Sequence, residues 1–270
     1  MRLRLIYDTF CALGMFALLA ACDEVDTSDR YIEVPAAKVE RTVLLEDFTG
    51  QKCVNCPDAH RIAEALEKQY GEHMVVVAIH CDLNMSYPAD NKRYTGLRQP
   101  EGQEYYERSG ITDGLPMGIV DGHRPAINAD RWADAVYNDI QQTTPLSIDM
   151  QAHLDGDRIA IECTLLSSES LTGNLVLWIV ESGIVARQES STGRINDYVH
   201  NNVFRACVNG LDGDAVNLVS REPRPFSYSI AIKKTDTEAW VPDNLAVVAF
   251  VKQGNDVAQA ARCSVTLQTN

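Results

Sequence analysis

Residues 42–56 read TVLLEDFTGQKCVNC, and this stretch decides the fold expected for the first half of the chain. Its first seven residues are mostly apolar and favour a β-strand, which the following Thr-Gly pair ends. From residue 57 to residue 70, apolar side chains recur every four positions, which predicts a helix that stops at Gly71. The two cysteines of the stretch therefore fall in the turn between a strand and a helix.

The same alternation continues along the chain. Residues 74–79, MVVVAI, form an uninterrupted apolar run, as expected for a strand whose two faces are both covered. Further elements are expected as a short helix at 101–108, a strand at 117–120 and a helix at 129–141. This order predicts an α/β domain over residues 42–143.

From Pro145 onwards the helical periodicity fades and short alternating strands take over. Seven strand candidates, separated by Gly, Asn, Asp and Pro, lie at 147–154, 158–166, 175–181, 197–208, 226–232, 245–251 and 258–267. Near-regular spacing of this kind is typical of an antiparallel sandwich. We therefore expect an all-β immunoglobulin-like domain over residues 146–270, with the boundary at Thr143-Thr144-Pro145.

Composition excludes several classes of protein. The 270 residues include 24 Lys and Arg against 38 Asp and Glu, which gives a formal net charge of −14. Because the sequence has no basic run, a groove for nucleic acid is not expected. With 45% hydrophobic residues, 16 Gly and 10 Pro, the chain is neither collagen-like nor largely disordered.

The first 22 residues indicate export. Arg2 and Arg4 precede an uncharged stretch from Thr9 to Cys22, which is shorter than the roughly 20 residues of a membrane-spanning helix. A basic start followed by a short apolar core is typical of a signal peptide, here residues 1–21. The end of this segment, LAAC, resembles the lipobox of bacterial lipoproteins. The resemblance implies that Cys22 carries acyl chains such as palmitate; an ordinary signal peptide with an incidental cysteine is the alternative.

Residues 22–41 follow as an acidic tether. The sequence DEVDTSDR at 23–30 has too few apolar side chains to fold by itself. Acidic residues directly behind a lipidated cysteine also resemble the signal that sends Bacteroidota-type lipoproteins to the outer membrane and its outer face. A charged spacer without a sorting role is the alternative.

Cys53-Val54-Asn55-Cys56 is the main chemical motif. Haem attachment would require His directly after the second cysteine, where Pro57 stands instead. Structural zinc would require a second ligand pair at short spacing, and only His60 is near. Redox chemistry favours a pair at the start of a helix, where free N–H groups and the adjacent Lys52 stabilise a thiolate on the first cysteine. We expect no metal or cofactor, and either a redox dithiol or a structural Cys53–Cys56 disulfide.

Residues 46–56 also resemble the strand, turn and active-site helix of the thioredoxin family, and Gly110–Pro116 is similar to that family's glycine-rich approach to a cis-proline. The resemblance implies a thioredoxin-like domain in which four residues have catalytic roles. The implied roles are nucleophile for Cys53, resolving thiol for Cys56, cis-proline of the substrate groove for Pro116, and proton-transferring buried carboxylate for Asp47.

The sequence departs from that family at the cysteine motif, by one extra residue between Gly110 and Pro116, and by an insert before that segment; two of the four residues also have other interpretations. Lys52 replaces the usual aromatic residue, and Val54-Asn55 replaces Gly-Pro. Pro116 also fits an ordinary trans turn proline. Asp47 also fits a strand-end carboxylate, since Glu46 beside it is equally placed to be the buried acid.

The remaining polar and cysteine residues are interpreted as structural. His80 and Cys81 end an expected strand and are expected to be packed, Trp132 is expected in the core, and Tyr198–Arg205 is expected to be a polar sheet-face cluster. Besides Cys11, Cys22 and the two motif cysteines, four cysteines remain, and they can pair in three ways. Of these pairings we suggest a Cys207–Cys263 bridge, which would leave Cys81 and Cys163 as free thiols.

Taken together, the lipobox, the acidic tether, the cysteine motif and the segment His200–Val203 resemble the twenty-eight-kilodalton outer-membrane lipoprotein family of Bacteroidota. The resemblance covers essentially the whole chain, and that family is discussed as surface adhesins or receptors. It implies a lipid-anchored protein of the outer membrane; the sequence leaves open whether the protein faces the periplasm or the cell surface.

Two functions follow. The first is an anchored oxidoreductase that exchanges thiols and disulfides with envelope or surface proteins. The second is a non-enzymatic surface adhesin or receptor in which Cys53–Cys56 is a structural disulfide. The sequence leaves open whether the protein is an enzyme.

Overall fold

The computed structural model describes residues 39–267. These residues belong to one compact unit, Ala37–Asn270. The expected signal peptide, Cys22 and nearly all of the acidic tether lie outside the described residues. Within them, no helix is both long enough and apolar enough to cross a membrane.

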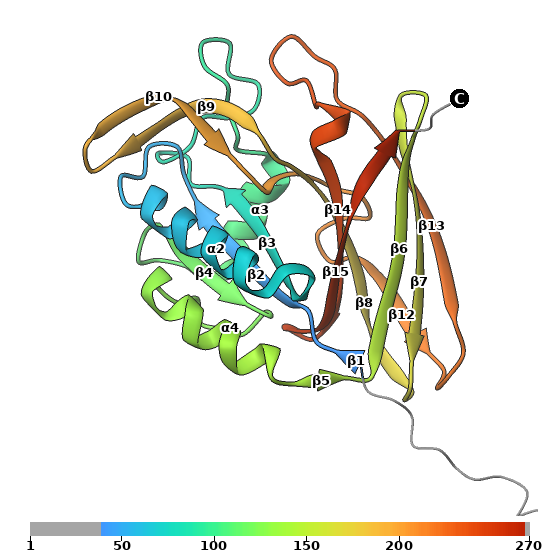
Figure 1. Ribbon diagram of the computed structural model, residues 1–270. Coiled ribbons are helices and arrows are strands. Elements are labelled where there is room, and N and C mark those ends of the chain that lie inside the picture. Colours follow the sequence, from blue (N-terminus) through green and yellow to red (C-terminus); the bar gives the residue numbers. More distant parts are fainter. Residues whose placement is uncertain (1–38, 268–270) are drawn as a thin grey trace, which may run out of the picture. The chain divides into compact units, whose positions relative to one another are not determined.

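Strands dominate the described part of the chain (Figure 1). The three α-helices there are α2 (Cys56–Tyr70), α3 (Pro100–Ser109) and α4 (Trp132–Ile140), and the short 3-10 helices are η2 (Gly71–His73), η3 (Ala129–Arg131) and η4 (Pro242–Asn244). The strands are β1 (Val39–Glu40), β2 (Val43–Thr49), β3 (Met74–His80), β4 (Met117–Val120), β5 (Thr143–Thr144), β6 (Leu146–Asp155), β7 (Arg158–Ser167), β8 (Leu171–Glu181), β9 (Ile184–Ser190), β10 (Gly193–His200), β11 (Val203–Cys207), β12 (Asp214–Leu218), β13 (Arg224–Ala231), β14 (Leu245–Gln253) and β15 (Asp256–Leu267).

One mixed, 11-stranded sheet passes through both halves of the chain. Its order is β13-β7-β6-β15-β14-β8-β11-β3-β2-β4, and β12 pairs with β8. β2 and β3 are parallel, whereas β4 runs antiparallel to β2. The two halves meet where β11 lies parallel to β3, with Val203 opposite Ala78.

The predicted fold class was therefore wrong. We predicted an α/β thioredoxin-like domain followed by a separate immunoglobulin-like sandwich, but the structure is mostly β, and its main sheet continues from β4 to β13 without a break. The error has a physical cause: periodicity reports which residues form strands, but pairing between residues as far apart in the sequence as Ala78 and Val203 depends on tertiary contacts.

Individual elements nevertheless lie where the sequence predicts them. β2, α2, β3, β4 and α4 all overlap their predicted ranges. Trp132 is fully buried at the start of α4, as expected, and its indole Nε1 donates to the carbonyl of Ile127 at 3.1 Å. Gly118 makes room for this ring, because a Cβ there would lie 2.3 Å from the indole nitrogen.

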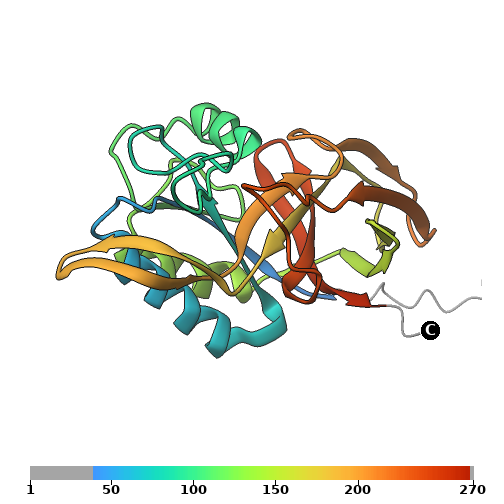
Figure 2. The ribbon, with the colours of Figure 1, turned by 90° about the horizontal axis from the view of Figure 1, so that it is seen from above.

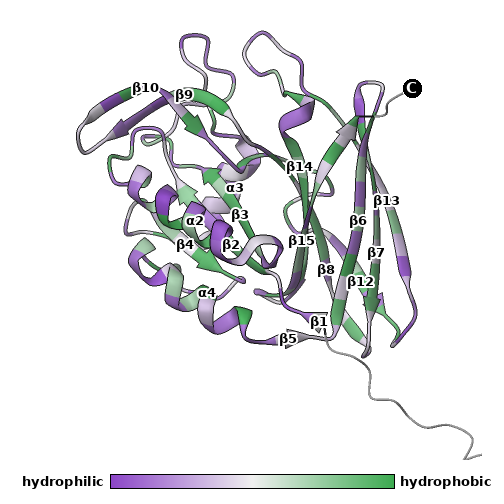
Figure 3. Ribbon diagram, in the orientation of Figure 1, coloured by the Kyte–Doolittle hydropathy of each residue, from purple (hydrophilic) through white to green (hydrophobic). Residues whose placement is uncertain are grey.

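The central strands carry an apolar core on each face. Along β8, Leu177 and Ile179 join one cluster of buried side chains, whereas Trp178 and Val180 join another. Because both faces are covered, β8 is uninterruptedly apolar from Leu175 to Val180. Figure 3 shows this hydrophobic character along β3 and β8.

Trp178 contacts aromatic rings from both halves of the chain in this core. Its ring meets Tyr105 at 5.1 Å between centroids, and it meets Phe204 at 5.2 Å and Phe250 at 4.8 Å, all edge to face. Tyr105 lies in α3 of the first half, whereas the other two partners belong to the second half. Such aromatic pairs add about 0.5–1.5 kcal/mol each beyond the burial of their area.

We expect Trp178→Ala to lower the free energy of unfolding by about 3–5 kcal/mol, because it removes a fully buried indole. Urea unfolding followed by circular dichroism measures this change. Since the ring is shared by both halves, the variant is expected to keep a single transition. Tyr137→Ala, at a side chain that is 57% exposed, is the control and should change stability by less than about 0.5 kcal/mol. Two separate transitions in the wild type would contradict the shared core.

Candidate functional site

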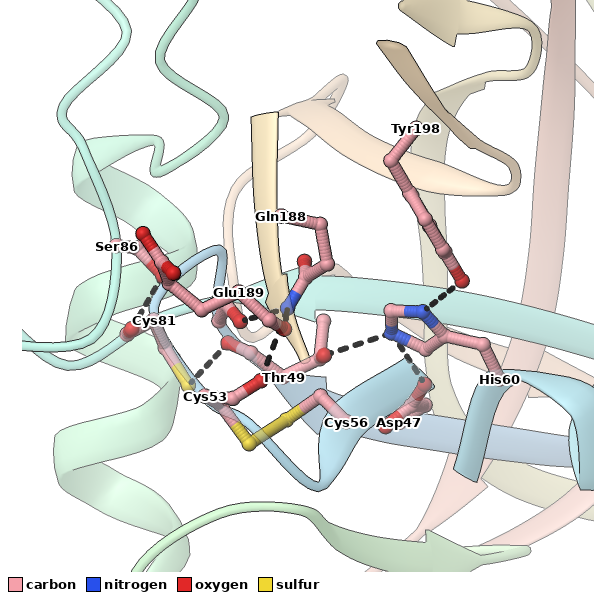
Figure 4. The surroundings of a disulfide bond; sticks show 11 residues. Asp47, Thr49, Cys53, Cys56, His60, Cys81, Ser86, Gln188, Glu189 and Tyr198 are labelled. Atoms are coloured by element: carbon pink, nitrogen blue, oxygen red, sulfur yellow. Dashed lines mark hydrogen bonds and ion pairs between the residues drawn. A yellow bond between two sulfur atoms is a disulfide. The ribbon is translucent and has the colours of Figure 1, made fainter. Parts of the chain in front are cut away.

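Cys53 and Cys56 form a disulfide bond at the junction between β2 and α2 (Figure 4). Cys53 lies in the turn after β2, and Cys56 is the first residue of α2. Gly50 makes the turn possible, because a Cβ there would lie 2.7 Å from the carbonyl oxygen of Met85. That same oxygen accepts a hydrogen bond from the Lys52 amide at 2.8 Å. The bond that the sequence suggested is thus present, and its catalytic role stays a prediction.

Both half-cystines are buried. Cys53 exposes 5% of its surface and Cys56 exposes none, whereas Val54 between them is 49% exposed. Solvent therefore reaches Val54 more readily than it reaches either cysteine.

A hairpin from the second half of the chain covers the turn. β9 and β10 pair with each other in a sheet of their own, and the hairpin projects from the main sheet (Figures 1 and 2). Gln188 in β9 is fully buried, and its side-chain Nε2 donates to the carbonyls of Gly50 at 3.1 Å and Cys53 at 2.9 Å. The amide of Glu189 donates to the carbonyl of Gln51 at 2.8 Å. Sequence reasoning missed Gln188, because nothing local marks a glutamine as the partner of a loop 135 residues away.

The segment between β3 and α3 is fixed to the same turn. The side-chain amide of Gln51 is 1% exposed and donates to the carbonyl of Thr95 at 3.0 Å. Its Oε1 accepts the amide of Leu97 at 3.2 Å. The disulfide turn is therefore held from two sides by buried polar contacts.

Asp47 and Glu46 are both buried, each 1% exposed, but on opposite faces of the sheet. Glu46 faces α3 and accepts the hydroxyl of Tyr105 at 2.5 Å, and burial raises the pKa of Glu46 to about 7. Asp47 faces α2, with its Oδ2 3.7 Å from Nε2 of His60. Burial raises the pKa of Asp47 to about 8.

His60 connects Asp47 with the helix that carries the disulfide. It lies four residues after Cys56, which places both on one face of α2. Its Nε2 is 2.8 Å from the hydroxyl of Thr49, and its Nδ1 is 2.9 Å from the hydroxyl of Tyr198 in β10 (Figure 4). Burial lowers the pKa of His60 to about 4, so the ring is neutral at pH 7.

Two further histidines lie behind His60. The ring of His200 is 6.4 Å from that of His60 and 5.1 Å from that of His80, between centroids. A cavity of about 20 Å³ borders all three rings together with Asp47 and Tyr198. His80 is packed, as expected, and burial lowers the pKa of both His80 and His200. Within residues 39–267, no three His, Cys, Asp or Glu side chains are arranged to hold a metal ion.

Pro116 lies at the same end of the sheet as the disulfide. The peptide bond between Leu115 and Pro116 is cis, so the reading as an ordinary trans proline was wrong. Phe48 in β2 pairs with Met117 in the antiparallel strand β4. Pro116, one residue before Met117, therefore lies opposite Thr49, at the end of β2 that leads to the cysteines. Its role in a substrate groove stays a prediction.

The bridge that we named between Cys207 and Cys263 is absent. Both residues are free thiols, as are Cys81 and Cys163. Cys207 pairs with Trp178, whose side chain belongs to the core cluster on one face of the sheet. Cys263 pairs with Val247, whose side chain belongs to the core cluster on the opposite face. Directly paired residues share a face, so the two thiols lie on opposite faces of the sheet and cannot meet.

Comparison with known proteins gives one family and a similar fold. The model of a family described as outer membrane protein Omp28 matches residues 103–268. Among solved structures, HBP35 of Porphyromonas gingivalis is similar at a TM-score of 0.62 and 16% identity, over 85% of this chain and 76% of that chain. A domain of the outer membrane lipoprotein Omp28 from Porphyromonas gingivalis matches at a TM-score of 0.34 and 18% identity, over 47% of this chain and 92% of that chain. No curated protein matches.

The family model covers only part of the candidate site. The residues matched by the family model include Gln188, Tyr198 and His200, whereas Cys53 and Cys56 precede them. At 16% identity, the likeness to HBP35 shows a shared fold alone.

We expect Gln188→Ala to expose the disulfide. Without the side-chain amide, the carbonyl of Cys53 loses a buried donor, which costs about 1–3 kcal/mol for an unpaired group, whereas the carbonyl of Gly50 keeps the Cys53 amide. Reduction by dithiothreitol, followed by alkylation and mass spectrometry, should be at least severalfold faster than in the wild type. Gln253→Ala, at an exposed glutamine that bonds to Thr172, is the matched control. An unchanged reduction rate would show that the hairpin does not restrict access.

We expect Asp47→Asn to gain stability relative to the wild type as the pH rises. The pKa of Asp47 is about 8 in the folded chain against 3.8 in the unfolded chain. Between these values the unfolded state releases a proton that the folded state keeps, so folding becomes less favourable with rising pH. Urea unfolding at pH 5 and pH 8 should show the difference growing by on the order of 3–4 kcal/mol. Asp149→Asn, at an exposed carboxylate, should show no such change.

Proposed function

The chain belongs to the outer membrane protein Omp28 family and is a protein of the outer membrane, and we propose that it exchanges disulfide bonds with thiols of envelope or surface proteins through Cys53 and Cys56. A single observation carries this proposal: the disulfide joins the turn after β2 to the first residue of α2. His60 lies on the same face of this helix as Cys56, and Asp47 lies beside His60.

The surroundings of the disulfide favour exchange for two reasons. The free N–H groups at the start of a helix stabilise a thiolate and so make cysteine a better leaving group. The raised pKa of Asp47 keeps its carboxyl group largely protonated at pH 7, so a proton is available on this side of α2.

The proposed reaction begins with a thiolate of a partner protein that carries two thiols. This thiolate attacks Sγ of Cys53, the Cys53–Cys56 bond breaks, and a mixed disulfide forms. Cys56 leaves as a thiolate and takes the carboxyl proton of Asp47. The second thiol of the partner, as its thiolate, then attacks the partner sulfur of the mixed disulfide and releases Cys53 as a thiolate. The partner is thereby oxidised to a disulfide, and Cys53 and Cys56 are reduced.

The exposed surface beside the turn supports contact with a polypeptide. Val54 is 49% exposed and Met85, whose carbonyl binds the Lys52 amide, is 37% exposed. The ammonium group of Lys52 lies 4.6 Å from the centre of the Tyr87 ring, which fixes a positive charge next to Cys53. Apolar side chains around a fixed cation suit an extended segment that presents a thiolate.

We also propose that the chain is anchored through acyl chains on Cys22. The cysteine ends an LAAC sequence behind a basic, apolar leader, and several acyl chains at about 0.8 kcal/mol per buried CH₂ give stable attachment.

A second candidate function is favoured by the burial of both cysteines. Cys53 is 5% exposed, Cys56 is fully buried and Gln188 fixes the carbonyl of Cys53. Buried cysteines of this kind are usually inert. In that case the disulfide only joins the turn to α2, and the protein acts as a surface adhesin or receptor.

Trapping of partner proteins distinguishes the two candidates. In cells that express the full chain, Cys56→Ala leaves Cys53 as a free thiol. By the reverse of the proposed exchange this thiol attacks disulfides of envelope proteins, and because Cys56 is missing the mixed disulfides are not resolved from this side and should accumulate on non-reducing gels. They should disappear in Cys53→Ala/Cys56→Ala. Cys163→Ala, which removes a buried free thiol, is the matched control. If Cys53 in the Cys56→Ala chain is alkylated no faster than an ordinary thiol, the structural role is correct.

Replacement of Cys22 tests the anchor. Cys22→Ser should abolish labelling by a fatty-acid analogue and move the chain from the outer-membrane fraction to the soluble envelope fraction. Detection of the chain by antibody in each fraction measures this shift. Acylation that persists in Cys22→Ser would contradict the anchor at this position.

A further inference from the structure

Asp47 lacks a route for proton exchange of its own. It is 1% exposed, and its Oδ1 has no hydrogen-bond partner within the described residues. After giving its proton to Cys56, the group would be a buried carboxylate, which is unfavourable in this environment. Repeated exchange therefore requires a group that returns a proton to Asp47.

His60 is the polar side chain placed to do this. Its Nε2 lies 3.7 Å from Oδ2 of Asp47, and its Nδ1 lies 2.9 Å from the hydroxyl of Tyr198. The hydroxyl of Thr49, 2.8 Å from Nε2, holds the ring in this orientation. A shift of about 1 Å brings Nε2 within hydrogen-bond distance of Asp47.

Tyr198 is hydrogen-bonded to this imidazole and is itself partly exposed to solvent. It is half-buried in β10, where its ring packs against His200 at 4.8 Å between centroids and its hydroxyl faces His60. The cavity of about 20 Å³ next to Asp47, His60 and Tyr198 is large enough for one water molecule.

We infer that His60 and Tyr198 form a proton path between solvent and Asp47 and act, through Asp47, as positioning residues for disulfide exchange at Cys56. The inference rests on the proposed function. In one concerted transfer, the Asp47 carboxylate takes a proton from Nε2 of His60, Nδ1 takes one from the Tyr198 hydroxyl, and Tyr198 takes one from a solvent water, whose hydroxide is then neutralised by buffer acid. The result is a protonated Cys56 thiol, with no further change of oxidation state.

Several other titratable groups surround the path and contribute to any pH dependence. α2 contributes Arg61, Glu64 and Glu67, the end of β3 contributes His80 and Cys81, β10 contributes His200, and β15 contributes Arg262. The histidines among them are held neutral by burial, so the proton passes through neutral imidazole rather than a fixed cation.

Single-turnover reduction of the disulfide tests the path. The full-length lipoprotein in detergent is mixed with dithiothreitol between pH 6 and pH 9 and quenched with acid, and its thiols are counted by alkylation and mass spectrometry. Tyr198→Phe keeps the ring but removes the hydroxyl, and His60→Ala removes the imidazole. Tyr137→Phe, which removes an exposed hydroxyl, is the control.

We expect reduction at pH 7 to be about threefold slower in Tyr198→Phe and about tenfold slower in His60→Ala. Added imidazole should restore the rate of His60→Ala, because it can enter the space of the missing ring. The equilibrium with glutathione should stay within twofold of the wild type for Tyr198→Phe, since a proton path changes a rate and not an equilibrium.

Three results would overturn the inference. Unchanged rates in both variants exclude the path. Both residues have a purely structural role if two results occur together: imidazole fails to restore the reduction rate of His60→Ala, and the equilibrium of Tyr198→Phe with glutathione is shifted. A wild-type chain that dithiothreitol reduces no faster than an unactivated model disulfide overturns the proposed function itself, and the path with it.

Discussion

The parallel pairing of β3 with β11 is the constraint on which the rest of the structure depends. Val203 lies opposite Ala78, and the Ala78 amide donates to the carbonyl of Asn202 at 2.8 Å. Because β11 directly follows the β9–β10 hairpin, this register fixes where the hairpin leaves the main sheet. The side chain of Asn202 also donates to Glu67 of α2 at 2.8 Å, so the same turn holds the helix.

The disulfide, the buried acid and the histidines meet as a result of this pairing. β2 and β3 end at the same edge of the sheet because they are parallel, which brings Asp47 and His80 to one place. β10 then adds Tyr198 and His200 from the second half. Burial of so many polar groups costs free energy, and it is offset by the apolar clusters on both faces of the central strands. A site that is costly to maintain in this way is typical of function.

The sequence predicted individual elements better than their assembly. The apolar runs of β2 and β3 and the four-residue spacing in α2 locate strands and helix, because burial on one face or on both leaves a local pattern. The candidate residues Cys53, Cys56, Asp47 and Pro116 all lie near one end of β2. The fold class was wrong, because no local pattern reports that β11 pairs with β3. Gln188 was missed for the same reason.

The sequence by itself determined what depends on neighbouring residues: the apolar strands, the turn that carries the two cysteines, the net negative charge and the export signal with its LAAC end. Only the tertiary structure decided that one sheet joins both halves, that Gln188 covers the disulfide turn and that Cys207 and Cys263 face apart. The physical reason is range. Side-chain periodicity reflects burial within one element, whereas strand pairing and buried hydrogen bonds join residues more than a hundred positions apart, and their partners are fixed only when the whole core packs.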